Sequence, residues 1–415
     1  MKEIKTDIAV IGGGPAGMAA ALEARRQGAG KVMIIERDIE QGGILQQCIH
    51  DGFGLHRFKK RLSGTDYAQR FIDEVEASDI EVFLDTMVLE ITKDKVVYAC
   101  NNRDGMMKIR CGAVILAMGC RERTASQVLL YGYRPAGVMT AGSVQRYINM
   151  EGYLPGKEAV ILGSGDIGLI MARRMTLEHI KVKGVYEVMQ EPGGLTRNIV
   201  QCLDDYDIPL HLATTVTWIH GKDRLEGVTV AKVDENRKVI PGTEETISCD
   251  LLVLAVGLIP ENELSVKAGI EMDPRTRGPV LDNHFMTSVP GIFAAGNVAV
   301  VFDLVDYVSE SGEIAARGAA AYLNGTLDTE AEVVETVPGE NVNFIVPQRM
   351  RVGSRDETTL FMRVKKPEKS VRLTCENGGE TLVSKKLKTV APPEMVACTV
   401  TPKHDEPLVV DVKEA

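Results

Sequence analysis

The chain has 415 residues, 44% of them hydrophobic and 26% charged, which is typical of a globular protein with two or three domains. Its net charge of −10 argues against nucleic acid or an anionic membrane as the natural partner. No apolar run reaches the ~18 residues of a membrane span. The N-terminus enters a strand without the apolar region of a signal peptide. We therefore expect a cytoplasmic protein with no membrane span.

The first forty residues predict a strand, a helix and a second strand. An apolar run at 8–11 leads into a glycine loop at 12–17 and then into a helical stretch at 18–27. A second apolar run, at 32–35, ends at Glu36. Continuous apolar runs on either side of a glycine turn and a helix are typical of a βαβ unit in a buried parallel sheet.

The same pattern recurs in the middle of the chain. An apolar run at 159–162 precedes a second glycine loop at 163–168, a helix through Met175 and a strand that ends at Glu187. The interval from Gly163 to Glu187 equals the interval from Gly12 to Glu36, and each acid precedes a Gly-Gly pair by the same distance. The chain therefore repeats one architecture.

Each half also contains a small predicted meander and a returning strand. Turn signals at 104–105 and 221–223 separate alternating segments, which indicates antiparallel strands. A buried strand then ends in a glycine in both halves, over 114–119 and over 251–257. These features complete two similar dinucleotide-binding units of α/β class.

The two glycine loops carry the functional prediction. With 40 glycines, one G-x-G-x-x-G match is weak evidence, because about 0.4 such matches are expected from composition alone. Two copies with matched acids are not explained in that way. In such a loop the first glycine permits the turn, the second lets the backbone approach a pyrophosphate, and the third lets the helix pack on the strand. The helix N-terminus attracts the diphosphate, and the acid accepts hydrogen bonds from an adenosine ribose.

On these motifs the sequence resembles the two-dinucleotide-domain flavoproteins, the pyridine nucleotide-disulfide oxidoreductase class that includes thioredoxin reductase. The resemblance covers roughly residues 5–325, and the segments at 117–119, 255–257 and 287–297 support it. It implies a glutathione-reductase-like fold of two Rossmann-like domains. It also implies that the first loop binds FAD and the second, inserted domain binds the nicotinamide cofactor. Asn297 stands where the family usually has an acid that bonds the ribityl chain, and an amide can still form hydrogen bonds there.

We expect a discontinuous FAD-binding domain over 1–122 and 268–326, an NAD-binding domain over 123–267 and a C-terminal β-rich module over 335–415. From residue 341 onward, 13 Lys/Arg exceed 10 Asp/Glu, so this tail carries +3 and the rest carries −13. Short alternating runs at 344–346, 359–364, 371–375 and 395–400 predict strands in the module.

The candidate cofactor-binding residues follow from the loops and from the resemblance. They are, for FAD, Gly12, Gly14, Pro15, Ala16, Gly17, Glu36, Arg37, Gly43, Ala117, Gly119, Gly296 and Asn297, and, for the nicotinamide cofactor, Gly163, Gly165, Asp166, Ile167, Gly168, Glu187 and Gly257. We also expect Glu310-Ser311-Gly312 to begin a helix aimed at the flavin pyrimidine.

Glu187 favours NAD over NADP. A carboxylate about 4 Å from a 2′-phosphate charge costs roughly 4 kcal/mol at an effective dielectric of 20. The residues after Glu187, 188–191, supply no arginine to offset this repulsion. Arg173 and Arg174 on the preceding helix are the residues that could overturn the preference.

The eight cysteines contain no C-x-x-C pair, so the sequence predicts no zinc site and no redox dithiol. Where the resemblance places a cysteine pair after the Gly-Gly, Leu45 and His50 stand instead, and residues 135–140 also lack cysteine. Disulfide reduction is therefore disfavoured. Cys48 and His50 are candidate catalytic residues near the flavin, as a redox thiol and a proton donor. The alternative is that Cys48 packs as a small apolar residue and His50 bonds a backbone carbonyl.

Further likeness, over 42–50, 163–174, 257–264 and 303–306, is to flavoprotein subunits of heteromeric dehydrogenases. These include hydrogen cyanide synthase, the opine or hydroxyproline dehydrogenases, and the companion protein of anaerobic-type glycerol-3-phosphate dehydrogenases. Several amine-oxidising relatives carry a C-terminal iron–sulfur module, but Cys375 and Cys398 are too few for a cluster. This departure favours the glycerol-phosphate companion type.

The leading functional hypothesis is an FAD- and NAD-dependent oxidoreductase that passes electrons to or from a partner dehydrogenase subunit. We expect such a partner, a homo-oligomer, or both. The first alternative is a freestanding NADH oxidase or diaphorase that uses oxygen or a quinone. The second is a non-catalytic dinucleotide-binding protein, which the retention of both acids argues against.

Overall fold

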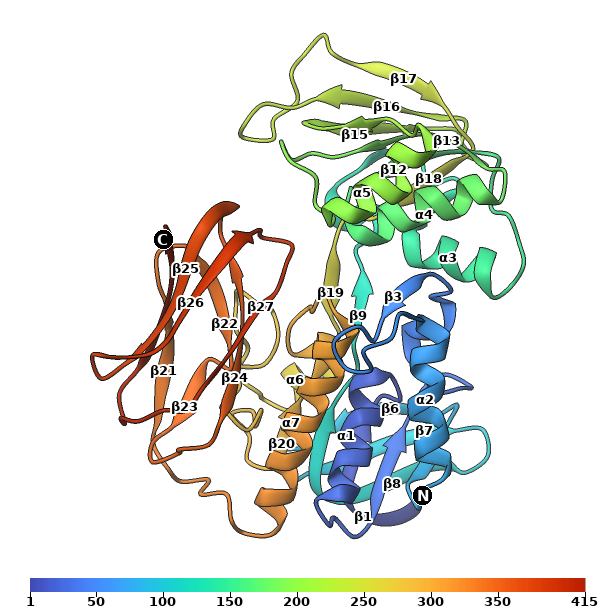
Figure 1. Cartoon of the computed structure of the whole chain (residues 1–415). Coiled ribbons are helices and arrows are strands. Elements are labelled where there is room, and N and C mark those ends of the chain that lie inside the picture. Colours follow the sequence, from blue (N-terminus) through green and yellow to red (C-terminus); the bar gives the residue numbers. More distant parts are fainter. Residues whose placement is uncertain (415) are drawn as a thin grey trace. The chain divides into compact units, whose positions relative to one another are not determined.

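The computed structural model describes residues 1–414, and the chain forms two compact units (Figure 1). The first unit comprises residues 1–120 and the chain from Pro260 onward. The second unit, Arg121–Ile259, is inserted between those two parts. In the described residues, no helix is both long enough and apolar enough to cross a membrane.

The first unit is built on a seven-stranded sheet with the order β5-β2-β1-β8-β7-β6, in which β20 pairs with β8. The parallel part of this sheet consists of β5, β2, β1, β8 and β20, in that order. Its strands are β1 (Lys2–Ile11), β2 (Val32–Ile35), β5 (Glu81–Phe83), β6 (Met87–Ile91), β7 (Val96–Asn101), β8 (Gly105–Leu116) and β20 (Ile292–Ala294). The strands β1, β2 and β8 are apolar where they pair because both faces of the sheet are covered.

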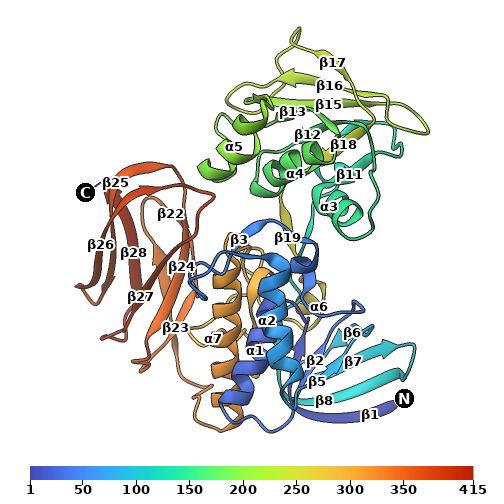
Figure 2. The same cartoon turned by 45° about the vertical axis from the view of Figure 1, so that its right-hand side comes forward.

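Three helices accompany this sheet: α1 (Pro15–Arg26), α2 (Gly64–Glu76) and α7 (Val305–Leu323). Proline at the first position suits α1, and a reciprocal Ser63–Asp66 capping box begins α2. Helix α1 packs against α7, as both views show (Figures 1 and 2). Shorter elements of this unit are η1 (Gly43–Gln47), β3 (Asp51–Phe53), β4 (Leu62–Ser63), α6 (Glu263–Lys267) and η4 (Gly296–Val298).

The expected helix start at Glu310 is wrong, because α7 already begins at Val305. Ser311 lies inside the helix, where its hydroxyl donates to Val308 O and accepts a hydrogen bond from Gly296 N at 2.8 Å. The Glu-Ser-Gly pattern therefore marks a tertiary contact inside a helix and not a helix cap.

The second unit repeats the parallel architecture. Its five-stranded sheet has the order β11-β18-β12-β13-β14, with every pair parallel. The strands are β11 (Val138–Thr140), β12 (Glu158–Leu162), β13 (Lys181–Tyr186), β14 (Leu210–His211) and β18 (Leu251–Leu254), and the helices are α3 (Ala141–Asn149), α4 (Asp166–Leu177), α5 (Thr196–Cys202), η2 (Ala125–Val128) and η3 (Asp204–Tyr206).

The predicted meander of this unit is a four-stranded sheet with the order β10-β15-β16-β17. Its strands are β10 (Tyr131–Gly132), β15 (Thr214–His220), β16 (Gly227–Lys232) and β17 (Glu245–Ser248). The chain crosses between the units through β9 (Cys120–Glu122) and β19 (Leu258–Pro260), which pair with each other.

The C-terminal part is a β-sandwich, which confirms the expected β-rich module. A five-stranded sheet has the order β23-β21-β28-β25-β26, and a three-stranded sheet has the order β22-β24-β27. The strands are β21 (Val333–Pro338), β22 (Val342–Val346), β23 (Arg349–Arg351), β24 (Thr358–Val364), β25 (Glu368–Asn377), β26 (Glu380–Val390), β27 (Val396–Val400) and β28 (Leu408–Glu414).

The three-stranded sheet is buried on both faces. Leu360 and Met362 pack in the core of the sandwich, whereas Phe344 and Phe361 pack in the core of the seven-stranded sheet. A buried ion pair, Arg351–Asp282 at 2.7 Å, also joins the module to the flanking loops of the first unit. One face of the three-stranded sheet therefore packs in the same apolar core as the seven-stranded sheet, and its other face packs in the core of the sandwich.

Candidate dinucleotide sites

In the first unit, three loops meet at the carboxyl ends of β1, β8 and β20. This is the edge at which open parallel sheets bind ligands. Gly12 has a φ of +110°, and a Cβ there would overlap the carbonyl oxygen of Ala117. A Cβ at Gly296 would lie 2.8 Å from the Ala16 Cβ. The predicted residues of 12–17, 117–119 and 296–297 are thus brought together.

The three glycines of this loop serve different purposes. A Cβ at Gly17 would overlap the Gly12 carbonyl oxygen, so Gly17 permits close packing of helix and strand. A Cβ at Gly14 would meet no atom of residues 1–414 within 4 Å. Packing therefore does not require glycine at position 14. The open space in front of it, beside the N-terminus of α1, fits a pyrophosphate.

Glu36 is buried behind the loop. Its Oε2 accepts from Gly13 N at 2.6 Å and its Oε1 accepts from Asp38 N at 2.8 Å. Both oxygens retain lone pairs for ribose hydroxyls. The buried Gln41 Oε1 has no hydrogen-bond partner within the described part of the chain, so it offers a further acceptor. These donors and acceptors fit the adenosine half of a dinucleotide.

The second loop repeats this geometry in its own unit. A Cβ at Gly163 would overlap Ala255 O, and one at Gly168 would lie 2.6 Å from Gly163 O. At Gly165 a Cβ would again find nothing within 4 Å among the described residues. The middle glycine thus leaves open space beside the N-terminus of α4, and this space fits a second pyrophosphate.

Sequence reasoning missed the role of Ser164. Its backbone N and its hydroxyl donate to Glu187 Oε2 at 2.9 and 2.7 Å, and its hydroxyl accepts from Gly193 N at 2.8 Å. Glu187 Oε1 also accepts from Met189 N at 2.9 Å. A serine between the first two glycines was the available signal, but its partner at 193 could not be known from local sequence.

Asp166 holds the loop that follows the second acid. Its Oδ1 accepts from Leu195 N at 2.8 Å and from Asn198 Nδ2 at 2.7 Å. The two arginines that could have attracted a 2′-phosphate have other partners. Arg173 Nε donates to the Tyr206 hydroxyl at 3.2 Å, whereas Arg174 donates to Asn149 and pairs with Glu178.

The other predicted residues take varied positions. Pro15 is the first residue of α1, and a Cβ at Gly43 would lie 3.2 Å from Gly14 Cα. Ile167 packs against the core of the second unit, and Gly257 lies beside the Arg123 side chain. Arg37 is exposed.

Residues 6–317 match the family model described as pyridine nucleotide-disulphide oxidoreductase. The chain belongs to this family. Its members are flavin-dependent oxidoreductases that bind FAD and NAD(P)H.

Similar proteins support the same fold and class. An opine oxidase subunit from Agrobacterium tumefaciens is 26% identical over 76% of this chain and 66% of that protein. Hydrogen cyanide synthase subunit HcnB from Pseudomonas protegens is 26% identical over 63% and 58%, respectively. The match thus spans less than two thirds of either relative. The structure of thioredoxin reductase from T. acidophilum superposes with a TM-score of 0.62 at 24% identity, over 76% of this chain and 98% of that one.

Disulfide reduction through the protein would require a reactive thiol pair, and no disulfide joins any of the eight cysteines in the described residues. Burial raises the pKa of the Cys111, Cys249 and Cys375 thiols to about 12, so these thiols stay protonated and poorly reactive. Cys48 is buried, with its Sγ 3.3 Å from Ile44 O, and the His50 ring lies 5.0 Å from the Phe53 ring.

Asn297 is the last residue of the segment 287–297, which supports the resemblance to the flavoproteins. Its Oδ1 accepts from Phe302 N at 3.0 Å, and its Nδ2 lies 3.5 Å from Cys120 Sγ. The amide therefore orients the loop that leads into α7. Cys120, directly after Gly119, is a neighbour that sequence reasoning did not identify.

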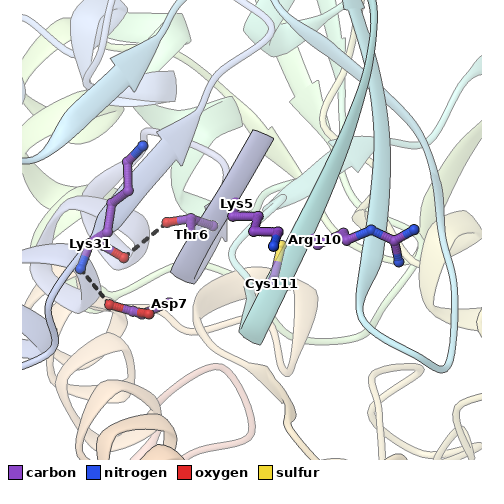
Figure 3. A pocket seen from close by; sticks show the side chains of 6 residues that line it. All are labelled: Lys5, Thr6, Asp7, Lys31, Arg110 and Cys111. Carbon is purple, nitrogen blue, oxygen red and sulfur yellow. Dashed lines mark hydrogen bonds between the residues drawn. The ribbon is translucent and has the colours of Figure 1, made fainter. Parts of the chain in front are cut away.

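A small pocket of the first unit lies away from these loops. Lys5, Thr6, Asp7, Lys31, Arg110 and Cys111 line it (Figure 3). Lys31 N donates to Asp7 at 2.6 Å, and Lys31 O accepts from the Thr6 hydroxyl at 2.9 Å (Figure 3). These residues lie toward the amino ends of β1 and β2, opposite to the edge at which such sheets bind ligands. This pocket therefore lies away from the edge at which we expect the cofactors.

Proposed function

We propose that the chain exchanges hydride between NAD(H) and FAD and passes electrons to or from a dehydrogenase partner subunit. The observation that carries this proposal is the combination of two open glycine loops, each with a buried acid, and the lack of a cysteine pair after the first loop. The first feature supports both cofactors, and the second removes the usual destination of the electrons.

A flavin and a nicotinamide supply direct hydride transfer when their reactive carbon and nitrogen atoms are held together. The residues of this chain therefore act mainly by binding and orienting. The loop amides and the helix N-termini hold the two diphosphates, and Glu36 and Glu187 hold the two riboses. Asn297 orients the loop beside the flavin site.

NAD is the better fit to the second site. Glu187 is a buried carboxylate where a 2′-phosphate would have to lie, and Ser164 and Met189 fix its position. Arg173 and Arg174 contact Tyr206, Asn149 and Glu178. With those arginines engaged, the repulsion of roughly 4 kcal/mol at a dielectric of 20 is not offset by a nearby cation.

A partner subunit is the natural electron acceptor or donor. Two relatives of this chain are named as subunits of larger enzymes. In this chain the C-terminal segment from residue 341 carries +3 while the rest carries −13, an asymmetry that can orient docking of a charged partner. The companion protein of a glycerol-3-phosphate dehydrogenase remains our preferred class for this chain, because its tail has only two cysteines.

The test is anaerobic reduction of the purified full chain with NADH and with NADPH, followed by reoxidation. We expect NADH to bleach the flavin with the higher efficiency, slow reoxidation by oxygen or quinone, and fast reoxidation by a co-purifying dehydrogenase. Rapid turnover with oxygen or quinone alone would instead identify a freestanding oxidase or diaphorase. A flavin that never bleaches would identify a non-catalytic binding protein.

His50→Gln tests the candidate proton donor. We expect slower turnover with the acceptor and an unchanged rate of flavin bleaching by NADH, because only reoxidation needs the proton. Cys48→Ala is the matched variant for the thiol. Unchanged turnover in both variants would leave His50 and Cys48 as packing residues.

A further inference from the structure

The connection between β20 and α7, residues 295–304, is held from two sides. Its first half belongs to the flavin motif: Gly296 N donates to Ser311, and Val298 O accepts from Asn262 Nδ2 at 2.8 Å. We call residues 295–304 the flavin loop. The loop contains Asn297 and leads into the N-terminus of α7. Its path therefore positions both of these features beside the proposed FAD site.

The second half of the flavin loop is held by the C-terminal module. Arg363 Nη2, on β24, donates to Val301 O at 3.1 Å, and Met395 N donates to Asp303 Oδ2 at 3.0 Å. The Phe302 ring meets the Phe361 ring edge-on with centroids 5.1 Å apart. The module therefore supplies polar and apolar contacts to three consecutive residues of the loop.

The charges at this junction are incompletely satisfied. Among residues 1–414, neither Arg363 Nε nor Asp303 Oδ1 has a hydrogen-bond partner, although both atoms are buried. Asp306, in the first turn of α7 and 7% exposed, likewise has an Oδ1 without a described partner, while its Oδ2 accepts from His56 N. Such atoms destabilise a fold unless a ligand, water or function accounts for them.

The charges of Arg363 and Asp303 influence each other. Burial lowers the pKa of the Arg363 guanidinium, and the negative charge of Asp303 opposes that shift. The described part of the chain shows no ion pair between them within 4 Å. A partly buried cation on β24 thus bonds the flavin loop just before Phe302, and a partly buried anion of the loop itself, Asp303, directly follows Phe302.

We propose that Arg363 of the C-terminal module is a positioning residue of the flavin site, which fixes the flavin loop and, with Asp303, sets the reduction potential of the bound flavin. This inference rests on the proposed FAD site. Nearby charge is a recognised means of tuning a bound flavin, because reduction makes the cofactor more negative. The Arg363 cation favours the reduced form, and the Asp303 carboxylate opposes it.

The experiment measures the midpoint potential of the flavin and its dissociation constant in the full-length holoprotein, without any acceptor. Arg363→Met should lower the potential and Asp303→Asn should raise it. We expect each to change the reduced-to-oxidised ratio about tenfold, or about 30 mV for two electrons. Arg363→Met should also weaken FAD binding about tenfold, and Arg363→Lys should restore most of the potential.

Controls separate this role from simple loosening of the fold. Arg372→Met removes an arginine of the same module that bonds Ser384 within the five-stranded sheet, and it should leave the flavin potential unchanged. A loosened loop would move the potential in the same direction for Arg363→Met and Asp303→Asn, or for neither, and either result overturns the proposal. Asp303→Asn alone decides the sign if Arg363→Met fails to fold. A wild-type chain that binds no FAD would instead refute the proposed function.

Discussion

The two glycine loops have the same spacing but are closed in different ways. In the first loop, Gly13 has little room for a side chain, because a Cβ there would lie 3.2 Å from Glu36 Cβ. The backbone N of Gly42 donates directly to Gly13 O at 2.9 Å. In the second loop, the Ser164 hydroxyl takes this place and bonds both Glu187 and Gly193 N. A backbone contact in one site is thus replaced by a side-chain contact in the other.

This comparison separates what binding needs from what packing needs. The first and third glycines are tightly packed in both loops, and the middle glycines face open space in both. The residue between the first and the middle glycine is Gly13 in one loop and Ser164 in the other, and it contacts the protein itself in both loops. Substitutions at one class of position at a time therefore test whether binding and packing depend on different glycines.

The largest effect is expected at the third glycine. Gly17→Ala places a methyl group against the Gly12 carbonyl, so either α1 or β1 must move, at a cost of about 1–3 kcal/mol in the free energy of unfolding. Gly168→Ala is the matched change, and its Cβ would lie 2.6 Å from Gly163 O, so we expect a smaller loss. Thermal unfolding and flavin content measure both. A Gly17→Ala protein with wild-type stability and full flavin would contradict the packing role.

The middle glycines should affect cofactor binding without affecting the stability of the ligand-free protein. Gly14→Ala should weaken FAD binding about tenfold, whereas Gly165→Ala should keep FAD and weaken NADH binding about tenfold, which corresponds to about 1.4 kcal/mol. Flavin content and NADH titration of the purified variants distinguish the two. Equal loss of both cofactors in either variant would refute the assignment of one cofactor to each loop.

The acid of the second loop should control cofactor choice. Glu187→Gln keeps the size of the side chain and one acceptor oxygen, so it can bond either Ser164 N or Met189 N but not both, and it removes the negative charge that repels a 2′-phosphate. We expect the ratio of kcat/KM for NADH to that for NADPH to fall at least about tenfold, since the full repulsion is several kcal/mol. Steady-state kinetics with both cofactors give this ratio. An unchanged ratio would show that the preference arises elsewhere.

The smallest effect is expected when the second loop is made to look like the first. Ser164→Gly removes the hydroxyl hydrogen bonds to Glu187 and Gly193 but leaves the backbone N–H bond to Glu187. We expect a loss of about 1 kcal/mol in total, at about 0.5 kcal/mol for each of the two hydrogen bonds, with a modest rise in the KM for NADH. Chemical unfolding and NADH titration measure the change. A variant that loses FAD would show that the effect spreads beyond its own unit.

Much of the fold could be predicted from the sequence because its signals are local. Buried parallel strands such as β2 and β12 are continuous apolar runs, and the acid-to-glycine spacing is a fixed property of a βαβ turn. The roles of Ser164 and Arg363 could not be predicted, because their partners lie far along the chain. The start of α7 was missed because Leu304, at its N-cap, makes no side-chain cap within the described structure.

The module was predicted only in part for a related reason. Strands β22, β24, β25 and β27 contain short apolar runs, but β26 is the exposed edge strand of its sheet and carries lysines, so its sequence resembles a loop. The burial of β22 and β24 on both faces depends on a neighbour more than 50 residues earlier in the chain, as the Phe361–Phe302 contact illustrates.

The burial of the three-stranded sheet against the seven-stranded sheet also affects how the chain folds during synthesis. Phe344, Phe361 and Met395 complete a core that begins with Ile8 and Val10, so a segment that is synthesised late finishes the packing of an early one. Contacts of such long sequence separation form slowly, and the incomplete core exposes apolar surface until they form. A chain that stops near residue 335 is therefore expected to aggregate during synthesis, even though every glycine-loop residue has already been translated.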